Sequence, residues 1–212
     1  MIIEQLTAVP LVPVLRNVPY KKSAAIVKAL IDGGVTSIEV TMETDRAEDI
    51  ITETIEAYGS QILVGAGTVL SVDDCRRAIQ AGAQFIVAPT LDEEVVQFAV
   101  EQEVPVIPGV FTPSEMQRAI NLGASMIKLF PASVLGPAFI KDVKGPLGHI
   151  QIMTTGGITL DTAKDYLKAG ATAIGAGSAL LRNDLIAAED WAGLVNETRI
   201  WMEKLKISET AI

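Results

Sequence analysis

The sequence is poor in the residues that build disulfides and metal clusters. Its 212 residues include one cysteine, Cys75, and one histidine, His149. A single cysteine cannot form an internal disulfide, and together the two residues cannot supply a Cys/His zinc site. We therefore expect no metal, and we interpret Cys75 as a packing residue and His149 as a solvated loop residue.

Positive charge and long apolar runs are also scarce. There are 17 Lys and Arg residues against 26 Asp and Glu, the formal net charge is −9, and no basic run of five is present. Such a chain repels phosphate backbones, so we expect no nucleic-acid partner. No apolar run reaches the roughly 20 residues that cross a bilayer, and the start lacks a signal-peptide pattern. We expect no membrane partner and a cytoplasmic location.

Aromatic residues make up only 5% of the chain, whereas hydrophobic residues make up 49%. The core must therefore be built mainly from Val, Ile, Leu and Ala, which is typical of parallel α/β proteins whose strands are covered on both faces. The length of 212 residues suits one large domain, and no linker or low-complexity segment divides it. We expect a single domain over residues 1–212.

Strand-like and helix-like segments alternate along the chain. After a short helix at about 2–7, apolar runs predict strands at 11–15, 37–41, 62–66, 85–88, 104–107, 126–131, 150–154 and 172–175. Apolar spacings of three and four predict helices at about 24–33, 47–55, 71–82, 92–101, 113–123, 139–144, 160–170 and 191–205. The pattern is eight strand-then-helix units.

Four glycines mark a faint internal repeat. Gly34, Gly82, Gly123 and Gly170 each stand between a helix and the next strand, where a left-handed helix terminator is expected. Alternation without a hairpin signal predicts a compact (β/α)8 TIM barrel with a short N-terminal helix. An open doubly wound sheet is the alternative.

The apolar run 126–131 carries one lysine, Lys128, at its centre. Burial favours the neutral amine, which is the form that attacks a ketone to make a Schiff base. Two structural alternatives stay open, because the lysine can extend its amine to water or pair with a buried carboxylate.

Glu39 interrupts another apolar strand and should project inward together with Thr41. A carboxylate beside an imine-forming lysine would be placed to move protons. A purely structural Glu39–Lys128 ion pair is the alternative. Both interpretations require the two groups to be close.

Two glycine-containing segments, 154–159 and 175–178, follow the seventh and eighth expected strands. Glycine lets backbone amides approach an anion, and the loops after these two strands commonly bind phosphate in TIM barrels. Each segment alone would be no more than a tight turn. Together they predict a phosphate site.

Five motifs carry a family resemblance: PVLR at 13–16, IEVT at 38–41, GAGT at 65–68, KLFP at 128–131 and TGGI at 155–158. In this order and spacing the chain resembles the bacterial 2-keto-3-deoxy-6-phosphogluconate (KDPG) and 4-hydroxy-2-oxoglutarate (KHG) aldolases over almost its whole length. The resemblance implies a compact barrel, a homotrimer and no metal or organic cofactor.

The resemblance also implies residue roles. Lys128 would form the covalent imine and Glu39 would be the general acid/base. The implied substrate contacts are Thr68 and Thr155 for the pyruvyl carboxylate, Pro89 and Phe130 for its pocket, Arg16 for a polar end, and Gly156, Gly157, Gly177 and Ser178 for the distal phosphate.

Two positions depart from the family pattern. Some members carry an arginine four residues after the glutamate, where this chain has Glu43, and relatives often have proline where this chain has Thr154. A negative charge at Glu43 would repel a keto acid, so we expect this side chain to point toward solvent or toward Arg46. Carboxylate binding would then depend on Arg16, Thr68, Thr155 or Arg46.

The implied activity is that of a class I aldolase of the Entner–Doudoroff pathway. Its substrate would be a 2-keto acid, either KDPG, giving pyruvate and glyceraldehyde 3-phosphate, or KHG, giving pyruvate and glyoxylate. One alternative is a sugar-phosphate isomerase or epimerase in which Lys128 acts only as a charge. Another is a non-catalytic barrel that binds a sugar phosphate or a protein partner.

Overall fold

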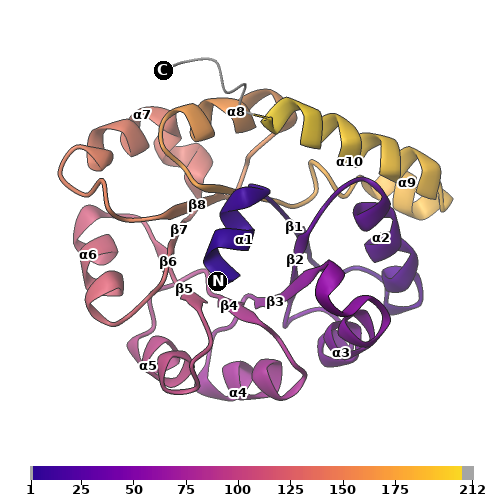
Figure 1. The fold of residues 1–212 in the computed structure, drawn as a ribbon, viewed down its shortest axis with the longest axis horizontal. Coiled ribbons are helices and arrows are strands. Elements are labelled where there is room, and N and C mark those ends of the chain that lie inside the picture. Colours follow the sequence, from indigo (N-terminus) through magenta and orange to yellow (C-terminus); the bar gives the residue numbers. More distant parts are fainter. Residues whose placement is uncertain (1, 207–212) are drawn as a thin grey trace.

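The computed structural model describes residues 2–206, in which strands and helices alternate around a ring (Figure 1). The strands are β1 (Leu11–Leu15), β2 (Ser37–Thr41), β3 (Leu63–Gly67), β4 (Phe85–Val87), β5 (Val106–Ile107), β6 (Gly109–Val110), β7 (Ile127–Leu129), β8 (Ile152–Thr155) and β9 (Ala173–Ala176). The helices are α1 (Ile2–Ala8), α2 (Tyr20–Asp32), α3 (Ala47–Tyr58), the 3-10 turn η1 (Gly59–Gln61), α4 (Val72–Gln80), α5 (Glu93–Glu101), α6 (Pro113–Asn121), α7 (Ala132–Lys144), α8 (Leu160–Lys168), α9 (Asn183–Ala188) and α10 (Trp191–Leu205).

The strands form one parallel sheet in the order β5-β4-β3-β2-β1-β9-β8-β7-β6. Its two end strands, β5 and β6, are separated only by Pro108, which has no backbone N–H to donate. The β5 segment is bonded on both sides, because Ala88 N donates to Ile107 O (3.2 Å) and Ser125 N donates to Val106 O (3.3 Å). The sheet therefore closes on itself, so the (β/α)8 barrel is confirmed and the open doubly wound sheet is wrong.

Two helical segments differ from the sequence expectation. Helix α7 begins at Ala132 rather than near residue 139, and it contains a kink at Gly136 (φ 73°) followed by Pro137. These two residues interrupt the helical spacing in the sequence, so the first turns of α7 were missed. The short α9 was also missed, because its six residues are too few to show a helical period.

The four glycines between helices and strands have the predicted left-handed conformation. Their φ angles are 103° at Gly34, 96° at Gly82, 98° at Gly123 and 111° at Gly170. A side chain at such an angle would be strained, whereas glycine adopts it without penalty. These residues let each helix end abruptly, which keeps the connections short.

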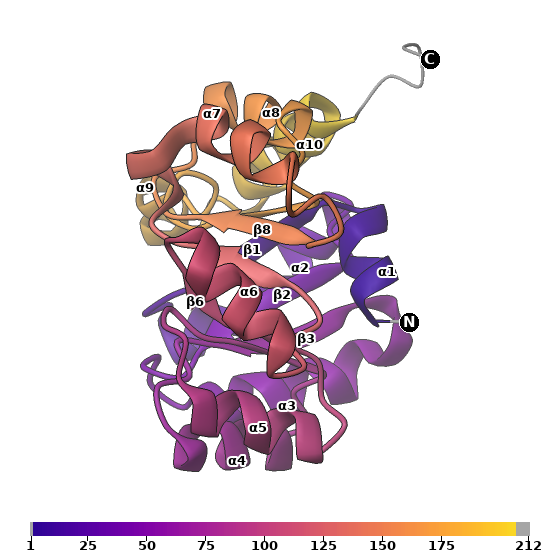
Figure 2. The ribbon, with the colours of Figure 1, turned by 90° about the vertical axis from the view of Figure 1, so that its left-hand side faces the viewer.

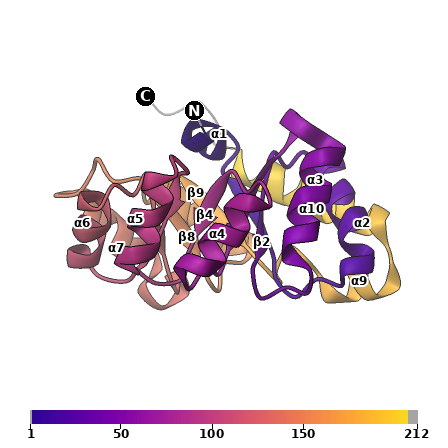
Figure 3. The same ribbon diagram turned by 90° about the horizontal axis from the view of Figure 1, so that it is seen from below.

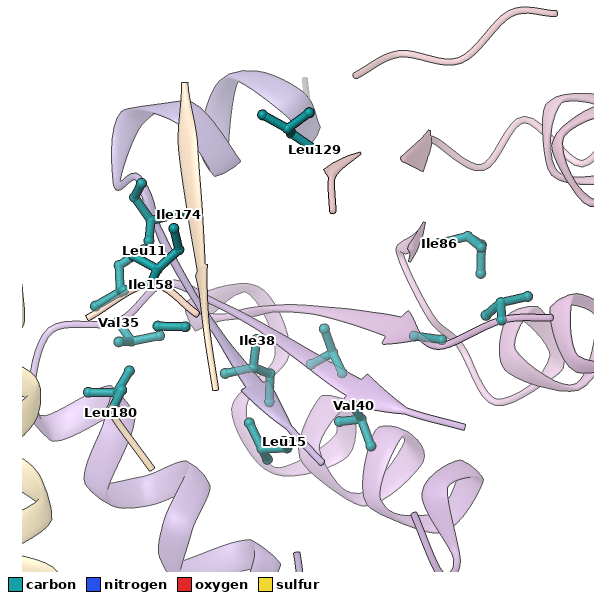
Figure 4. Close-up of a cluster of buried hydrophobic side chains, with 14 of the residues drawn as sticks. Leu11, Leu15, Val35, Ile38, Val40, Ile86, Leu129, Ile158, Ile174 and Leu180 are labelled. Atoms are coloured by element: carbon teal, nitrogen blue, oxygen red, sulfur yellow. The ribbon is translucent and has the colours of Figure 1, made fainter. Parts of the chain in front are cut away.

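Two hydrophobic clusters stabilise the barrel. Helices lie outside the sheet, with α7, α8 and α10 beyond β8 and with α3, α4 and α5 on the opposite side of the barrel (Figure 2). The larger cluster fills the space between the sheet and these helices and includes Leu15, Ile38 and Ile174 (Figure 4). The smaller one lies inside the amino-terminal half of the barrel and includes Leu6 of α1, the helix that lies at that end (Figure 3). Its buried members are Leu6, Val12, Leu63, Phe85, Val87, Ile107, Met126, Met153 and Ala173.

Helix α1 therefore closes the amino-terminal end of the barrel with apolar side chains. The carboxyl-terminal end has no such helix among residues 2–206, which places the open cavity there. Each helix in this part of the chain is too short or too polar to cross a bilayer.

Candidate active site

Lys128 and Glu39 meet inside the barrel. Lys128 lies on β7 and Glu39 on β2, and the sheet order separates these strands by β1, β9 and β8, so the side chains approach across the interior. Lys128 Nζ lies 3.6 Å from Glu39 Oε1, and the two side chains are 2% and 0% exposed. The structure thus brings together the two residues that both sequence interpretations required to be close.

The described residues around this pair do not supply the hydrogen bonds that usually offset the cost of burying a charged group. Within residues 2–206, neither carboxylate oxygen of Glu39 has a hydrogen-bond partner. A Cβ atom on Gly67 would overlap the Glu39 carboxylate, so glycine at this position makes the space that the carboxylate occupies. A buried ion pair without further hydrogen bonds is a poor source of stability, so stability alone does not account for this pair.

A cavity of about 610 Å³ opens at the carboxyl ends of the strands, with Lys128 in its wall. This volume is in the range of small-molecule sites, which are usually concave and carry a few convergent polar groups. The predicted residues that line it are Arg16, Lys128, Phe130, Thr155, Gly156, Gly157, Gly177 and Ser178. Glu39, Thr68 and Pro89 lie outside this lining, Glu39 directly behind the lysine amine.

The wall beside the amine combines an aromatic ring and a free hydroxyl. Lys128 Nζ lies 5.3 Å from the centre of the Phe130 ring, within cation–π range. Thr155 Oγ1 is buried and has no hydrogen-bond partner among the described residues. A Cβ atom on Gly175 would overlap this hydroxyl, so glycine at that position makes the space that the hydroxyl occupies.

The two glycine segments form the far wall of the cavity. Gly156 and Gly157 have φ angles of 94° and 72°, and Ser133 N donates to Gly156 O over 3.0 Å. A Cβ atom on Gly157 would overlap the Ser133 side chain, so the loop packs tightly against the start of α7. Consecutive backbone amides in such loops are suited to hold an anion.

Arg16 is held by two residues that are not among those lining the cavity. Its Nε lies 2.9 Å from Glu43 Oε1, and its Nη2 donates to Thr68 Oγ1 over 3.2 Å. The expectation that Glu43 points toward solvent is confirmed, because this side chain is 41% exposed, and its partner is Arg16 rather than the alternative, Arg46. Arg46 instead pairs with Asp49 at 2.6 Å and stands outside the cavity lining.

Several cavity residues were not predicted from the sequence. They lie on the loops after β1 and β9 or at the starts of α8 and α9, where no apolar period marks their direction: Asn17, Val18, Pro19, Thr159, Asn183 and Ile186. Asn17 has a φ of 51°, a left-handed angle at which asparagine is enriched, and this is the one signal that sequence reasoning could have used.

The two residues considered uninteresting in the sequence have no place in the cavity. Cys75 is buried in α4, and burial raises the pKa of its thiol to about 11, which keeps it protonated and unreactive near neutral pH. His149 is exposed before β8, at the opposite end of that strand from the cavity. Within residues 2–206, no three His, Cys, Asp or Glu side chains are grouped as metal ligands.

A parallel barrel with a buried amine, a carboxylate and glycine loops at the carboxyl ends of its strands defines the class of protein, a TIM-barrel enzyme for a small anionic substrate. Comparison with known proteins gives the family. Residues 2–196 match the family model described as "KDPG and KHG aldolase". The chain belongs to this family, and it is an aldolase, a carbon–carbon lyase.

Relatives cover most of the chain. The 2-dehydro-3-deoxy-6-phosphogalactonate aldolase of Escherichia coli K12 is 35% identical over 83% of this chain and 86% of its own length. The KHG/KDPG aldolase of the same organism is 34% identical over 95% of both chains. The structure of KDPG aldolase from Legionella pneumophila "with pyruvate captured at low pH as a covalent carbinolamine intermediate" superposes with a TM-score of 0.85, at 26% identity over 94% of this chain and 97% of that one.

Proposed function

We propose that this aldolase works through a Schiff base on Lys128. The observation that carries the proposal is the buried Lys128 Nζ, 3.6 Å from Glu39 Oε1 and in the wall of the cavity. A covalent carbinolamine with pyruvate was captured in the Legionella relative, which supports the same chemistry here. No metal and no organic cofactor takes part in the proposed reaction.

In the cleavage direction, Lys128 Nζ forms a bond to the C2 carbonyl carbon of the substrate, and loss of water leaves a protonated imine. Glu39 accepts the proton of the C4 hydroxyl as the C3–C4 bond breaks. The bonding electrons pass to the imine nitrogen, so an enamine forms and the aldehyde leaves. Protonation at C3 and addition of water then release pyruvate and regenerate the amine.

The remaining predicted residues receive positioning roles. The unpaired Thr155 hydroxyl and the Arg16–Thr68 pair are proposed to bind the carboxylate of the pyruvyl part, and Phe130 and Pro89 shape its surroundings. The glycine loops at Gly156, Gly157, Gly177 and Ser178 are proposed to hold the distal phosphate through backbone amides.

The proposed substrate is a 2-keto acid with a hydroxyl group at C4, and the predicted phosphate site favours a phosphorylated one. KDPG and KHG stay as candidates, and the names of relatives add the phosphogalactonate epimer. Initial rates of pyruvate release from each of the three substrates test the proposal and rank them. We expect release from at least one, and no release from any of them would contradict it.

A pair of lysine variants assigns the chemistry to one residue. Lys128→Met should abolish pyruvate release, because a thioether cannot form an imine. Lys28→Met removes the same charge from the exposed surface of α2 and should keep wild-type rates. Full turnover by Lys128→Met would contradict a Schiff base on this lysine, and it would equally exclude a role for its charge.

We also propose that the chain works as a homotrimer in the cytoplasm, as the family resemblance implies. Three exposed large apolar side chains support self-association: Leu70 and Phe111, on the loops after β3 and β6, and Val134, in the first turn of α7, are 54%, 38% and 70% exposed. Light scattering during gel filtration measures the mass of the assembly. A monomeric mass at micromolar concentration would contradict the trimer.

A further inference from the structure

The Arg16–Glu43 pair has a geometry that bears on substrate selection. Arg16 lines the cavity, whereas Glu43 and Thr68, which bind its guanidinium, are not among the lining residues. An arginine has five N–H donors in a fixed planar fork. Its Nε faces Glu43 and one donor of Nη2 is given to Thr68, which leaves the outer Nη1/Nη2 edge for a ligand.

The charge of this arrangement is nearly balanced. A free guanidinium attracts anions through its full positive charge, but here a carboxylate oxygen stands 2.9 Å from Nε. At the range of a ligand on the outer edge, which is about twice as far from Glu43 as from Arg16, the Glu43 charge opposes roughly half of the attraction of Arg16. The pair therefore offers directed hydrogen bonds with a weakened attraction for anions.

We infer that Glu43 is a positioning and specificity-determining residue for the aldolase. It orients Arg16 so that one edge faces the cavity, and it offsets the arginine charge, so that this wall favours a singly charged carboxylate or hydroxyl groups over a doubly charged phosphate. The inference rests on the proposed function, because it takes the cavity as the substrate site. It leaves the glycine loops as the wall for the phosphate.

The test uses Glu43→Gln, which keeps a carbonyl oxygen toward Arg16 but removes the charge. The substitution should leave folding intact, since Glu43 is 41% exposed. Steady-state rates are measured in the aldol direction with pyruvate and glyceraldehyde 3-phosphate, and again with uncharged glyceraldehyde as the acceptor. Each series is repeated at low and high salt.

We expect Glu43→Gln to lower the KM of at least one anionic substrate by about threefold to tenfold at low salt, with kcat little changed. The effect should be larger for the doubly charged than for the singly charged partner, absent for uncharged glyceraldehyde, and reduced at high salt by screening. A merely structural ion pair would produce no such separation of KM from kcat.

Asp49→Asn is the matched control. The Arg46–Asp49 pair lies close by in the sequence and is similarly exposed, but neither of its members lines the cavity. This variant should keep wild-type KM values. Equal KM values for Glu43→Gln, Asp49→Asn and the wild type would overturn the inference, while failure of the wild type itself to turn over would contradict the proposed function instead.

Discussion

The two halves of the barrel interior differ in what their side chains can do. The amino-terminal half is filled by apolar residues, among them Leu6, Phe85 and Met153, which are 0% exposed. The carboxyl-terminal half holds Glu39, Lys128 and a cavity. The first half is packed for stability, and the second keeps buried polar groups that packing alone would exclude.

The same strands supply both halves. Met126 precedes Lys128 by two residues, and Met153 precedes Thr155 by two, so each pair points to the same side of its strand. The apolar member of each pair belongs to the interior cluster, and the polar member lines the cavity. A single strand thus anchors the fold at one end and presents a reactive group at the other, which is the usual division in TIM barrels.

The largest effect is expected on kcat, from a substitution in the Glu39–Lys128 pair of the carboxyl-terminal half. Glu39→Gln keeps the shape but cannot accept a proton, so kcat for aldol cleavage should fall by about 10²–10⁴-fold. The thermal midpoint should fall as well, because removing one member of a buried pair leaves the other uncompensated, so kcat is measured well below the unfolding transition. Unchanged kcat would show that Glu39 takes no part in proton transfer.

A substitution in the amino-terminal half should cost a comparable free energy, but it should reduce the stability of the fold rather than the rate of the reaction. Phe85→Ala leaves a void in the interior cluster and should lower the free energy of unfolding by about 3–5 kcal/mol. Urea titration measures this loss, and activity below the unfolding transition should stay near that of the wild type. A large change in KM without loss of stability would contradict the separation of the two halves.

A substitution at Gly67 tests whether the position of the Glu39 carboxylate matters for the reaction. In Gly67→Ala the new Cβ atom would overlap the Glu39 carboxylate and displace it from Lys128. We expect kcat to fall by about tenfold or more, since small misplacements of a catalytic group are costly. Gly145→Ala is the control, because Gly145 does not line the cavity and a Cβ atom there meets only Asp142 O, at 3.3 Å. Equal rates for the two variants would contradict a positioning role for Gly67.

The smallest effect is expected on the surface of the barrel, at the capping box of α6. Glu115 accepts backbone hydrogen bonds from Phe111 and Thr112, and these bonds lower the pKa of its carboxyl group. A lowered pKa stabilises the folded state above the unfolded value, near 4.3, and this contribution is lost as pH falls through the folded pKa.

Glu115→Gln should therefore cost about 0.5–1 kcal/mol at pH 7 and less at about pH 3. Urea midpoints at the two pH values measure the difference. Glu94→Gln, in the first turn of α5, removes the same charge as a control. A constant penalty at both pH values would show that the carboxylate charge is irrelevant to the cap.

Much of the fold was predictable because local signals agree with the global structure. Apolar runs located the strands, and positive-φ glycines such as Gly34 and Gly170 located the helix ends. The break at Pro108 was not predictable, since a strand that pairs with two neighbours in turn depends on the closure of the whole sheet. The start of α7 was hidden by Gly136 and Pro137.

The site divides in the same way. Period two along β2 and β7 places Glu39 and Lys128 inside the barrel, so their meeting follows from local pattern plus fold class. The partner of Glu43 could not be predicted, because it depends on how the loop after β1 faces the loop after β2. The place of Asn183 in the cavity wall could not be predicted either, because it depends on how α9 lies beside the loop after β1.

The most direct test of the central claim is chemical trapping of the amine in the barrel. The wild-type protein is incubated with pyruvate, reduced with borohydride and measured by intact mass, followed by peptide mapping. We predict one stable pyruvyl adduct per chain, located on Lys128 and absent from Lys128→Met. An unchanged mass, or an adduct on another lysine, would contradict the Schiff-base account.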